Sequence, residues 1–312
     1  MSTRFVAGLD GGGSKTALCC LDAQGCVLLE ETFGPLNING MDTRAIDQTL
    51  AEIMDSISKV SGGLPSCAGM TIAAAGTSNP ECRGIINAGL RAAGYQGYFD
   101  LRGDHEAALQ GAVGSVGAVL IAGTGSICFG RSAAGRTARA GGWGYLLDDE
   151  GGGYAIGRDI LKAVLRASDK RAGETALTAA VYERLHASRP EDLIQAAYSK
   201  ESGKANIAGL AKLLQPAFLL GDAAAIRIVS RAAEELLMLC EAVIEGLGLS
   251  SQRLSLMGGV LDHIPALADL VRMKLNEKYP LLRVIAPLHN AAWGAADLAR
   301  ENYLNNQNDG AV

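Results

Sequence analysis

A glycine-rich turn follows the first apolar segment of the chain. Residues 8–16 read GLDGGGSKT, which places Asp10 between a strand-like run and three consecutive glycines. Backbone N–H groups in turns of this kind bind phosphate. A carboxylate beside phosphates can hold Mg²⁺ through water, because Mg²⁺ prefers oxygen ligands and keeps most of its waters. The segment therefore predicts a phosphate site with Mg²⁺ at Asp10.

A second carboxylate, Asp104, precedes an alanine-rich stretch over 105–113 that predicts a helix. Asp is a favoured N-cap residue, so helix capping is one interpretation. A carboxylate fixed at a helix start can also accept the proton of an attacking hydroxyl during phosphoryl transfer. The two interpretations are compatible, and Asp104, rather than its neighbour His105, is the candidate catalytic base.

The segment GGWGYLLDDEG (141–151) is too irregular and glycine-rich for a core element. Trp143 lies among glycines, so its ring can either stack on the apolar face of a sugar or serve as a buried anchor. Sugar hydroxyls need carboxylates, and the run DDE follows within the same segment. The combination is typical of a sugar-binding loop.

The residues after the first glycines exclude two common phosphate-binding motifs. The P-loop and the dinucleotide-binding turn both need a helix that begins directly after the glycines. Here two short apolar segments, 15–21 and 26–31, are separated by the turn DAQG. We expect strand, glycine turn, strand, turn and strand in succession.

The same design occurs again at 118–135. The apolar run AVLIA is followed by GTGS at 123–126, by ICFG and by the turn SAAG. Repetition on this scale indicates two related α/β halves rather than a solenoid, whose repeats are far shorter. Two such turns facing each other across a cleft would hold a polyphosphate from both sides.

The paired turns resemble the two phosphate loops of the actin, hexokinase and heat-shock ATPase superfamily. Within it, the chain is similar to the N-acetylglucosamine kinase-like members of the BadF/BadG/BcrA/BcrD-type ATPase family. The matching motifs follow the family order: LDGGGSKT (9–16), GPLNING (34–40), GDHEAA (103–108), IAGTGS (121–126), GGWGYLLDDEG (141–151) and LMGGV (256–260).

The resemblance implies an α/β fold with two RNase H-like (actin-like ATPase) domains and an interdomain cleft. The N-terminal domain would comprise 1–112 plus about 287–312, closed by the last helix. The C-terminal domain would comprise about 113–286. Its helical elaboration is expected at 161–165, 176–185, 207–220 and 223–248, where the apolar residues have helical spacing.

The resemblance also implies site residues. The family has its base at the position of Asp104, which would also contact the sugar, and the turn at 258–259 is used for adenosine. The nucleotide would bind Asp10, Gly11, Gly12, Gly13, Ser14, Lys15, Thr16, Gly123, Thr124, Gly258 and Gly259, although Lys15 could instead point to solvent. The sugar would bind Asn37, Asp104, Thr124, Ser126, Gly142, Trp143 and Asp149. Asp148 stands where the family usually has glycine, which adds a charge or a residue capable of a left-handed conformation.

The composition and charge of the chain argue against several classes of partner. The net charge of −5 over 312 residues argues against nucleic acid and anionic membranes. No apolar run approaches the roughly 20 residues of a membrane span, and the N-terminus lacks a signal-peptide pattern. The seven cysteines form no C-x-x-C pair, so reduced thiols, a cytoplasmic location and no zinc or iron–sulfur site are expected.

The sequence thus predicts an ATP- and Mg²⁺-dependent kinase that converts N-acetyl-D-glucosamine to its 6-phosphate. Glucosamine and N-acetylmuramic acid are alternative substrates, and the lactyl group of the latter would call for room and a cation. An ATPase activator of a CoA-linked dehydratase or reductase is a distant alternative, because the second phosphate loop reads GTGS rather than GGQD. A non-catalytic sugar sensor is the third alternative to the kinase. The resemblance further implies a homodimer.

Overall fold

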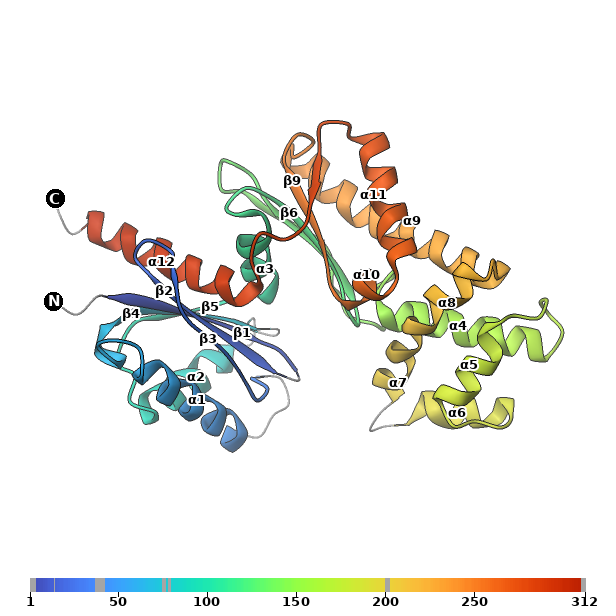
Figure 1. Cartoon of the computed structure of the whole chain (residues 1–312), viewed down its shortest axis with the longest axis horizontal. Helices are drawn as coiled ribbons and strands as arrows, with labels where there is room; N and C mark the ends of the chain where they lie inside the picture. Colours follow the sequence, from blue (N-terminus) through green and yellow to red (C-terminus); the bar gives the residue numbers. More distant parts are fainter. Residues whose placement is uncertain are drawn as a thin grey trace. The chain divides into compact units, whose positions relative to one another are not determined.

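The computed structural model describes residues 4–13, 15–36, 43–74, 77, 80–199 and 203–309. The chain divides into two compact units, Met1–Ser115 with Pro287–Val312, and Val116–Ala286. Within the described residues, each unit contains one five-stranded sheet with helices packed against it (Figure 1). The predicted α/β fold class is confirmed.

The sheet of the first unit has the order β3-β2-β1-β4-β5, with β2 antiparallel and β4 parallel to β1. Its strands are β1 (Phe5–Gly11), β2 (Thr16–Asp22), β3 (Val27–Phe33), β4 (Cys67–Ala74) and β5 (Phe99–Arg102). The predicted succession of strands and turns over the first 33 residues is therefore confirmed. Asp22 closes the second turn, because its Oδ1 accepts hydrogen bonds from the N–H groups of Gln24 (2.9 Å) and Cys26 (2.8 Å).

The sheet of the second unit repeats this topology, with the order β10-β9-β6-β7-β8. Its strands are β6 (Gly117–Ala122), β7 (Ser126–Arg131), β8 (Thr137–Gly141), β9 (Arg253–Met257) and β10 (Arg283–Ile285). Strands β6, β7 and β8 take the places of β1, β2 and β3, while β9 and β10 take those of β4 and β5. The internal duplication predicted from the two glycine turns is confirmed.

Helices cover both faces of the first sheet (Figure 1). Phe5, Ala7 and Leu9 of β1 lie in a core that includes buried residues of α1 and α2. Val6 lies on the opposite face, where it packs with α12. The helices of this unit are α1 (Thr43–Ser58), α2 (Pro80–Ala92), α3 (Asp104–Val113) and α12 (Ala291–Asp309), with the 3₁₀ turn η1 (Leu64–Ser66).

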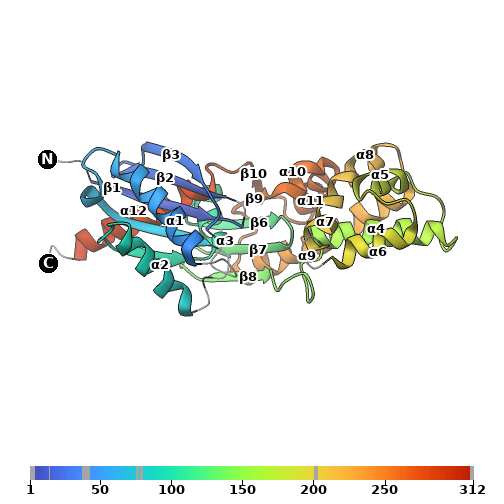
Figure 2. The same cartoon turned by 90° about the horizontal axis from the view of Figure 1, so that it is seen from below.

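The second unit carries most of its helices between β8 and β9. They are α4 (Gly153–Ser168), α5 (Leu177–Arg184), α6 (Pro190–Tyr198), α7 (Gly203–Gly209), η2 (Leu210–Leu213), α8 (Leu214–Leu219) and α9 (Ala223–Leu247), followed by α10 (Gly259–His263) and α11 (Pro265–Lys278). The predicted helical blocks are confirmed, and Figures 1 and 2 show α4 to α8 grouped beyond one end of the sheet. In the described part of the chain no single helix is long and apolar enough to cross a bilayer, and only one helix pair, bent by 119°, reaches that length.

Candidate active site

Asp10 occupies the next-to-last position of β1, the central strand of the first sheet. Burial raises the pKa of Asp10 to about 6, the nearby charge of Asp104 adds to the rise, and Lys15 opposes it. The two carboxylates and the ammonium group therefore interact at one end of the sheet. Because the charged form of Asp10 is disfavoured in this setting, a cation bound beside it would be stabilised.

The turn after Asp10 is closed by a hydrogen bond from Gly12 N to Lys15 O of 2.9 Å. Gly13 and Lys15 are exposed, whereas Thr16 is fully buried and its hydroxyl has no hydrogen-bond partner among the residues that the structure describes. Gly11 lies against the backbone, because a Cβ at this position would lie 3.0 Å from Leu36 O. Two predicted site residues, Ser14 and Asn37, lie outside the described residues.

Asp104 is the first residue of α3 and not its N-cap, so the capping interpretation is wrong. Gly103 is the N-cap: it has an extended conformation, and its N–H donates to Glu106 Oε1 at 3.2 Å. Asp104 instead accepts hydrogen bonds from the backbone N–H of His105 (2.9 Å) and from its ring Nδ1 (3.3 Å). The carboxylate is 54% exposed. These contacts, the His105 side chain first, lower the pKa of Asp104 despite its partial burial.

Gly103 makes room for the imidazole of His105. A Cβ on Gly103 would overlap the His105 ring. The ring thus packs on the bare backbone of the N-cap and from there reaches Asp104. His105 was not expected to act as the base, and the structure places it as a hydrogen-bond partner of the candidate base.

Close helix packing fixes α3 relative to β1. A Cβ on Gly111 of α3 would overlap Asn290 O, and one on Gly294 of α12 would overlap Ala107 O. A Cβ on Gly8 of β1 would in turn overlap the backbone of α12 at Ala296. Because these contacts are between backbones, α12 holds β1 and α3, and with them Asp10 and Asp104, at fixed positions.

A buried polar cluster joins the same two helices. Gln110 of α3 donates from Nε2 to Asp297 Oδ2 (2.8 Å) and to Glu301 Oε1 (2.9 Å) of α12. Arg300 pairs with Asp297 at 2.6 Å. Gln110 and Asp297 are almost fully buried, so these hydrogen bonds satisfy groups that would otherwise be costly to bury.

The second glycine turn joins β6 to β7. Gly123 N donates to Gly125 O at 2.9 Å, and the carbonyls of Gly123 and Thr124 accept the N–H groups of Gly153 and Tyr154 at the start of α4. Thr124 is exposed at the tip, while Ser126 is buried in β7. The turn is therefore bound directly to the first residues of a helix.

Asp149 lies against this turn. It has a left-handed conformation, with φ 64°, and a Cβ on Gly125 would overlap its carboxylate. The carboxylate accepts a hydrogen bond from Gly144 N at 3.2 Å. Burial raises the pKa of Asp149, partly offset by the N–H groups of Gly144 and Ser126. The left-handed residue is Asp149 and not Asp148, whose charge contributes to the raised pKa.

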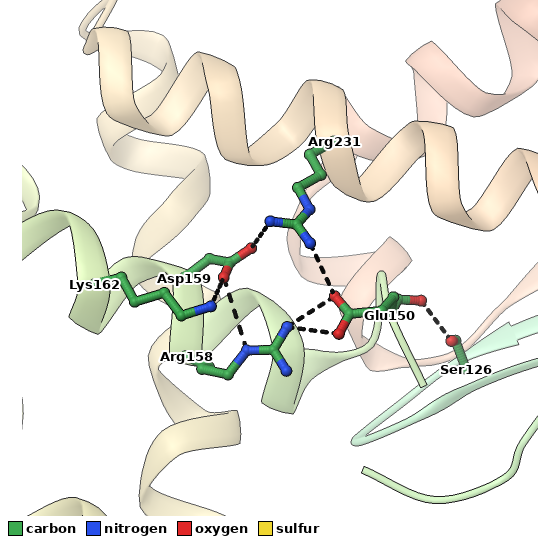
Figure 3. Close-up of polar contacts among 6 residues, drawn as sticks. All are labelled: Ser126, Glu150, Arg158, Asp159, Lys162 and Arg231. Carbon is green, nitrogen blue, oxygen red and sulfur yellow. Dashed lines mark hydrogen bonds and ion pairs between the residues drawn. The ribbon is translucent and has the colours of Figure 1, made fainter. Parts of the chain in front are cut away.

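Glu150, next to Asp149, belongs to an ion-pair network (Figure 3). Arg158 Nη2 donates to both of its carboxylate oxygens, at 2.6 and 2.8 Å. The hydroxyl of Ser126 donates to the backbone carbonyl of Glu150 at 2.7 Å. Ser126 thus anchors the end of the acidic turn to β7.

The ring of Trp143 is 64% exposed, so the buried-anchor interpretation is wrong. The guanidinium of Arg139 lies over it, 4.1 Å from the ring centroid. Gly142, before it, has a left-handed φ of 72° and donates to Ser126 O at 2.8 Å. After it, the ammonium of Lys204 lies 4.5 Å from the centroid of Tyr145. The loop therefore carries two aromatic rings, Trp143 and Tyr145, each with one cation lying on it.

A cavity of about 340 Å³ lies beside the second glycine turn, with Gly123, Thr124, Gly153, Lys212, Gly259 and His263 among its lining residues. Gly258, directly before the lining residue Gly259, has a φ of 102°, and a Cβ there would overlap Ala122 O. Two predicted nucleotide positions, the turns at 123–124 and 258–259, thus meet at one cavity. Lys212 and His263 were missed, because η2 and α10 resemble ordinary core helices in sequence.

In the described ranges no group of three His, Cys, Asp or Glu residues is arranged to hold a metal ion. The cysteines are free thiols, and all but Cys26 are buried. Asp10 remains the candidate Mg²⁺ contact, since a single water-mediated carboxylate is consistent with Mg²⁺ chemistry.

The fold is that of the actin-like ATPase kinases. A candidate N-acetylglucosamine kinase from Chromobacterium violaceum superimposes with a TM-score of 0.76 at 22% identity, over 96% of this chain and 99% of that one. A ROK hexokinase from Thermus thermophilus gives a TM-score of 0.60 at 17% identity, over 97% and 100%. At these identities the likeness concerns the fold alone.

The chain belongs to the BadF/BadG/BcrA/BcrD ATPase family, whose sequence profile matches residues 7–299. An N-acetylmuramic acid/N-acetylglucosamine kinase of Clostridium acetobutylicum is 38% identical over 301 residues, which cover 95% of this chain and 98% of the relative. An N-acetyl-D-glucosamine kinase of Dictyostelium discoideum is 30% identical over 314 residues, which cover 96% and 98%.

Proposed function

We propose that this protein is a kinase that transfers the γ-phosphate of ATP to O6 of N-acetyl-D-glucosamine. The observation that carries the proposal is the pairing of Asp10, whose pKa is raised, with Asp104, whose pKa is lowered, at one end of the first sheet. Two relatives, at 38% and 30% identity, are kinases of N-acetylated amino sugars, which supports the substrate class.

Asp10 would hold Mg²⁺ through water, since its charge is disfavoured until a cation offsets it. Mg²⁺ bound there would neutralise the charge of the phosphates during transfer. Backbone N–H groups of the turn at 11–16 would bind the phosphates, with the exposed Lys15 as an additional donor. In the second unit the turn at 123–124 would bind phosphate, and the cavity beside Gly258 and Gly259 would take the adenosine.

Asp104 would accept the proton of the 6-hydroxyl. Its lowered pKa keeps it ionised at neutral pH, and its exposure leaves an oxygen accessible to the substrate. The hydrogen bonds from His105 orient the carboxylate. A weak base suffices if the transition state is loose, because little negative charge then develops on the attacking oxygen.

The sugar would bind the loop at 142–149, where the exposed ring of Trp143 offers a stacking face and Asp149 an acceptor for hydroxyl groups. Asn37, Thr124 and Ser126 would complete this subsite. The hydroxyl of Ser126 is engaged by Glu150, so Ser126 would act by holding the acidic turn in place.

N-acetylmuramic acid is a second candidate substrate. Its lactyl carboxylate would need a cation, and Arg139 and Lys204 both lie beside the loop that carries Trp143 and Tyr145. The name of the relative from Clostridium acetobutylicum includes the same sugar.

We also propose that the two compact units are the two domains of the fold, that the protein is cytoplasmic and that it is a homodimer. The free thiols of the buried cysteines support a reducing compartment. The dimer rests on the family resemblance, and light scattering coupled to size-exclusion chromatography would test it.

The decisive experiment is ADP release with Mg²⁺ and ATP against N-acetylglucosamine, N-acetylmuramic acid, glucosamine, N-acetylmannosamine and glucose, for wild type and Asp104→Asn. Turnover with an N-acetylated amino sugar, lost in the variant while nucleotide still binds, is expected. ADP release that is independent of sugar and unchanged in the variant would contradict the proposal and favour an ATPase activator.

A further inference from the structure

A second cavity, of about 270 Å³, lies between α4 and α9 of the second unit. Four cationic side chains line it, Lys162 and Arg166 from α4 and Arg227 and Arg231 from α9. Their spacing of four residues places each pair on one helix face. We call this cavity the basic groove.

The positive charge of the basic groove is only partly balanced. Asp159, the one carboxylate in its lining, is shared by Lys162 (3.0 Å), Arg231 (3.8 Å) and Arg158 (3.8 Å). Within the described residues, Arg166 and Arg227 form no ion pair. Asp169 interacts electrostatically with Arg166, but its own ion pair is with Arg171, at 2.7 Å.

Such a concentration of cations is unusual in a chain whose net charge is −5. Guanidinium groups present paired N–H donors that match the oxygens of phosphate. The groove also has apolar walls, formed by Ala163, Ala224 and Ile228 among others, which suit the carbon part of a ligand. Its volume is just below the range of roughly 300–1,000 Å³ that is typical of small-molecule sites.

We propose that the basic groove binds a small phosphorylated metabolite through its phosphate. Arg166 and Arg227, which form no ion pair in the part of the chain that the structure describes, bind the phosphate oxygens, and Lys162 and Arg231 surround them. The cavity is lined by α4, α9 and the segment after α4 (Ala172 and Gly173), so it shares no residue with the two glycine turns.

The groove is linked to the acidic turn that precedes α4 (Figure 3). Arg231 reaches both Asp159, at 3.8 Å, and Glu150, at 3.9 Å, and Glu150 follows Asp149 directly. A phosphate that draws Arg231 into the groove leaves Glu150 paired with Arg158 alone. We therefore expect the ligand to change the KM for the sugar. This effect on KM rests on the proposed kinase function, whereas the binding of the ligand to the basic groove does not depend on it.

Calorimetric titration of the full chain with glucose 6-phosphate tests the site, with inorganic phosphate and citrate as comparison probes. Each titration is run with and without ADP and Mg²⁺, so that binding to the glycine turns is recognised by its loss when ADP is present. We expect one equivalent of glucose 6-phosphate to bind in both conditions, more tightly than inorganic phosphate.

The double variant Arg166→Glu/Arg227→Glu should weaken this binding at least tenfold. The matched control Arg272→Glu/Lys274→Glu makes the same charge change on α11 and should leave it unchanged. Circular dichroism and the melting temperature verify that both variants fold. Binding that is equal in the two variants, that is absent up to 10 mM probe, or that is tighter for citrate than for either phosphate would overturn the proposal.

Discussion

Asp104 lies close enough to Asp10 for its charge to act together with burial, and the two effects raise the pKa of Asp10 to about 6. The pKa of Asp104 is lowered, because the side chain of His105 donates a hydrogen bond to its carboxylate. Two neighbouring carboxylates thus differ in protonation near pH 6, which separates a metal-holding role from a proton-accepting one.

The raised pKa of Asp10 predicts an acid limb in the activity. As the pH falls through about 6, Asp10 takes up a proton and loses its ability to hold Mg²⁺, so kcat/KM for ATP should fall. Higher Mg²⁺ concentrations should move the midpoint to lower pH, because the cation competes with the proton. A steady-state pH profile at two Mg²⁺ concentrations measures this, and a midpoint that does not respond to Mg²⁺ would argue against a metal at Asp10.

The charged carboxylate of Asp10 should also lower the free energy of unfolding of the ligand-free protein. Its pKa is about 6 in the folded state against 3.8 ordinarily, so between these values the folded state keeps a proton that the unfolded chain has lost. Stability therefore declines as the pH rises through this window. Asp10→Asn should raise the free energy of unfolding by about 1–2 kcal/mol at pH 7.5 and by much less at pH 4.5.

Urea denaturation at both pH values measures that difference. Asp269→Asn, an exposed carboxylate of α11, is the control and should leave stability nearly unchanged. A destabilised Asp10→Asn protein at pH 7.5 would show that Asp10 makes compensating contacts in the fold.

Gly103→Ala should displace the His105 ring, because the added methyl group overlaps it. Asp104 then loses the ring contact at 3.3 Å, and we expect kcat to fall by roughly threefold to tenfold, as for the loss of one hydrogen bond of about 1 kcal/mol. The KM for ATP should change little. Gly84→Ala, at an open position of α2, is the matched control. Equal kinetics in the two variants would show that His105 does not position the Asp104 carboxylate.

Gly294→Ala tests the crossing of α3 and α12. The methyl group would overlap Ala107 O, and backbone cannot yield without separating the helices. We expect a loss of about 2–3 kcal/mol in the free energy of unfolding, whereas Gly84→Ala should gain about 0.5–1 kcal/mol from helix propensity. Thermal or urea unfolding of both proteins measures the difference, and a Gly294→Ala protein as stable as wild type would show that the crossing can widen freely.

Lys204→Met tests the second candidate substrate. If Lys204 binds the lactyl carboxylate, kcat/KM for N-acetylmuramic acid should fall about tenfold, as one lost charge-assisted hydrogen bond of about 1.5 kcal/mol requires. The value for N-acetylglucosamine should stay within about twofold, and Lys274→Met is the control for removal of a remote charge. An equal loss with both sugars would assign Lys204 to the loop structure rather than to substrate choice.

The sequence predicted the parts of the site that local patterns specify. Glycine runs after strands located both turns, and the run LMGG located a wall of the cavity at Gly259. The N-cap assignment failed by one residue, because Glu106 satisfies the N–H of Gly103 and leaves Asp104 inside the helix. This one-sided cap depends on the side chain of Glu106, three residues after Gly103, which competes with the more obvious candidate Asp104.

Contacts between different segments of the chain could not be predicted from the sequence. Arg158 pairs with Glu150 across the start of α4, and Arg231 reaches the same carboxylate from α9, 81 positions further along the chain. Nothing in an amphipathic helix distinguishes an arginine that binds such a partner from one that faces solvent. The same limit hid Lys212 and His263, whose place beside the glycine turn depends on how η2 and α10 pack.

The contact between Gly8 and α12 joins two segments that are far apart in the sequence. During synthesis β1 emerges first, but Ala292 and Ala296, which cover its second face, are made almost 290 residues later. At roughly 5–20 residues per second, that face waits on the order of tens of seconds for its cover. During that interval the nascent first unit exposes an apolar sheet surface that a chaperone would recognise, while the second unit can finish folding first.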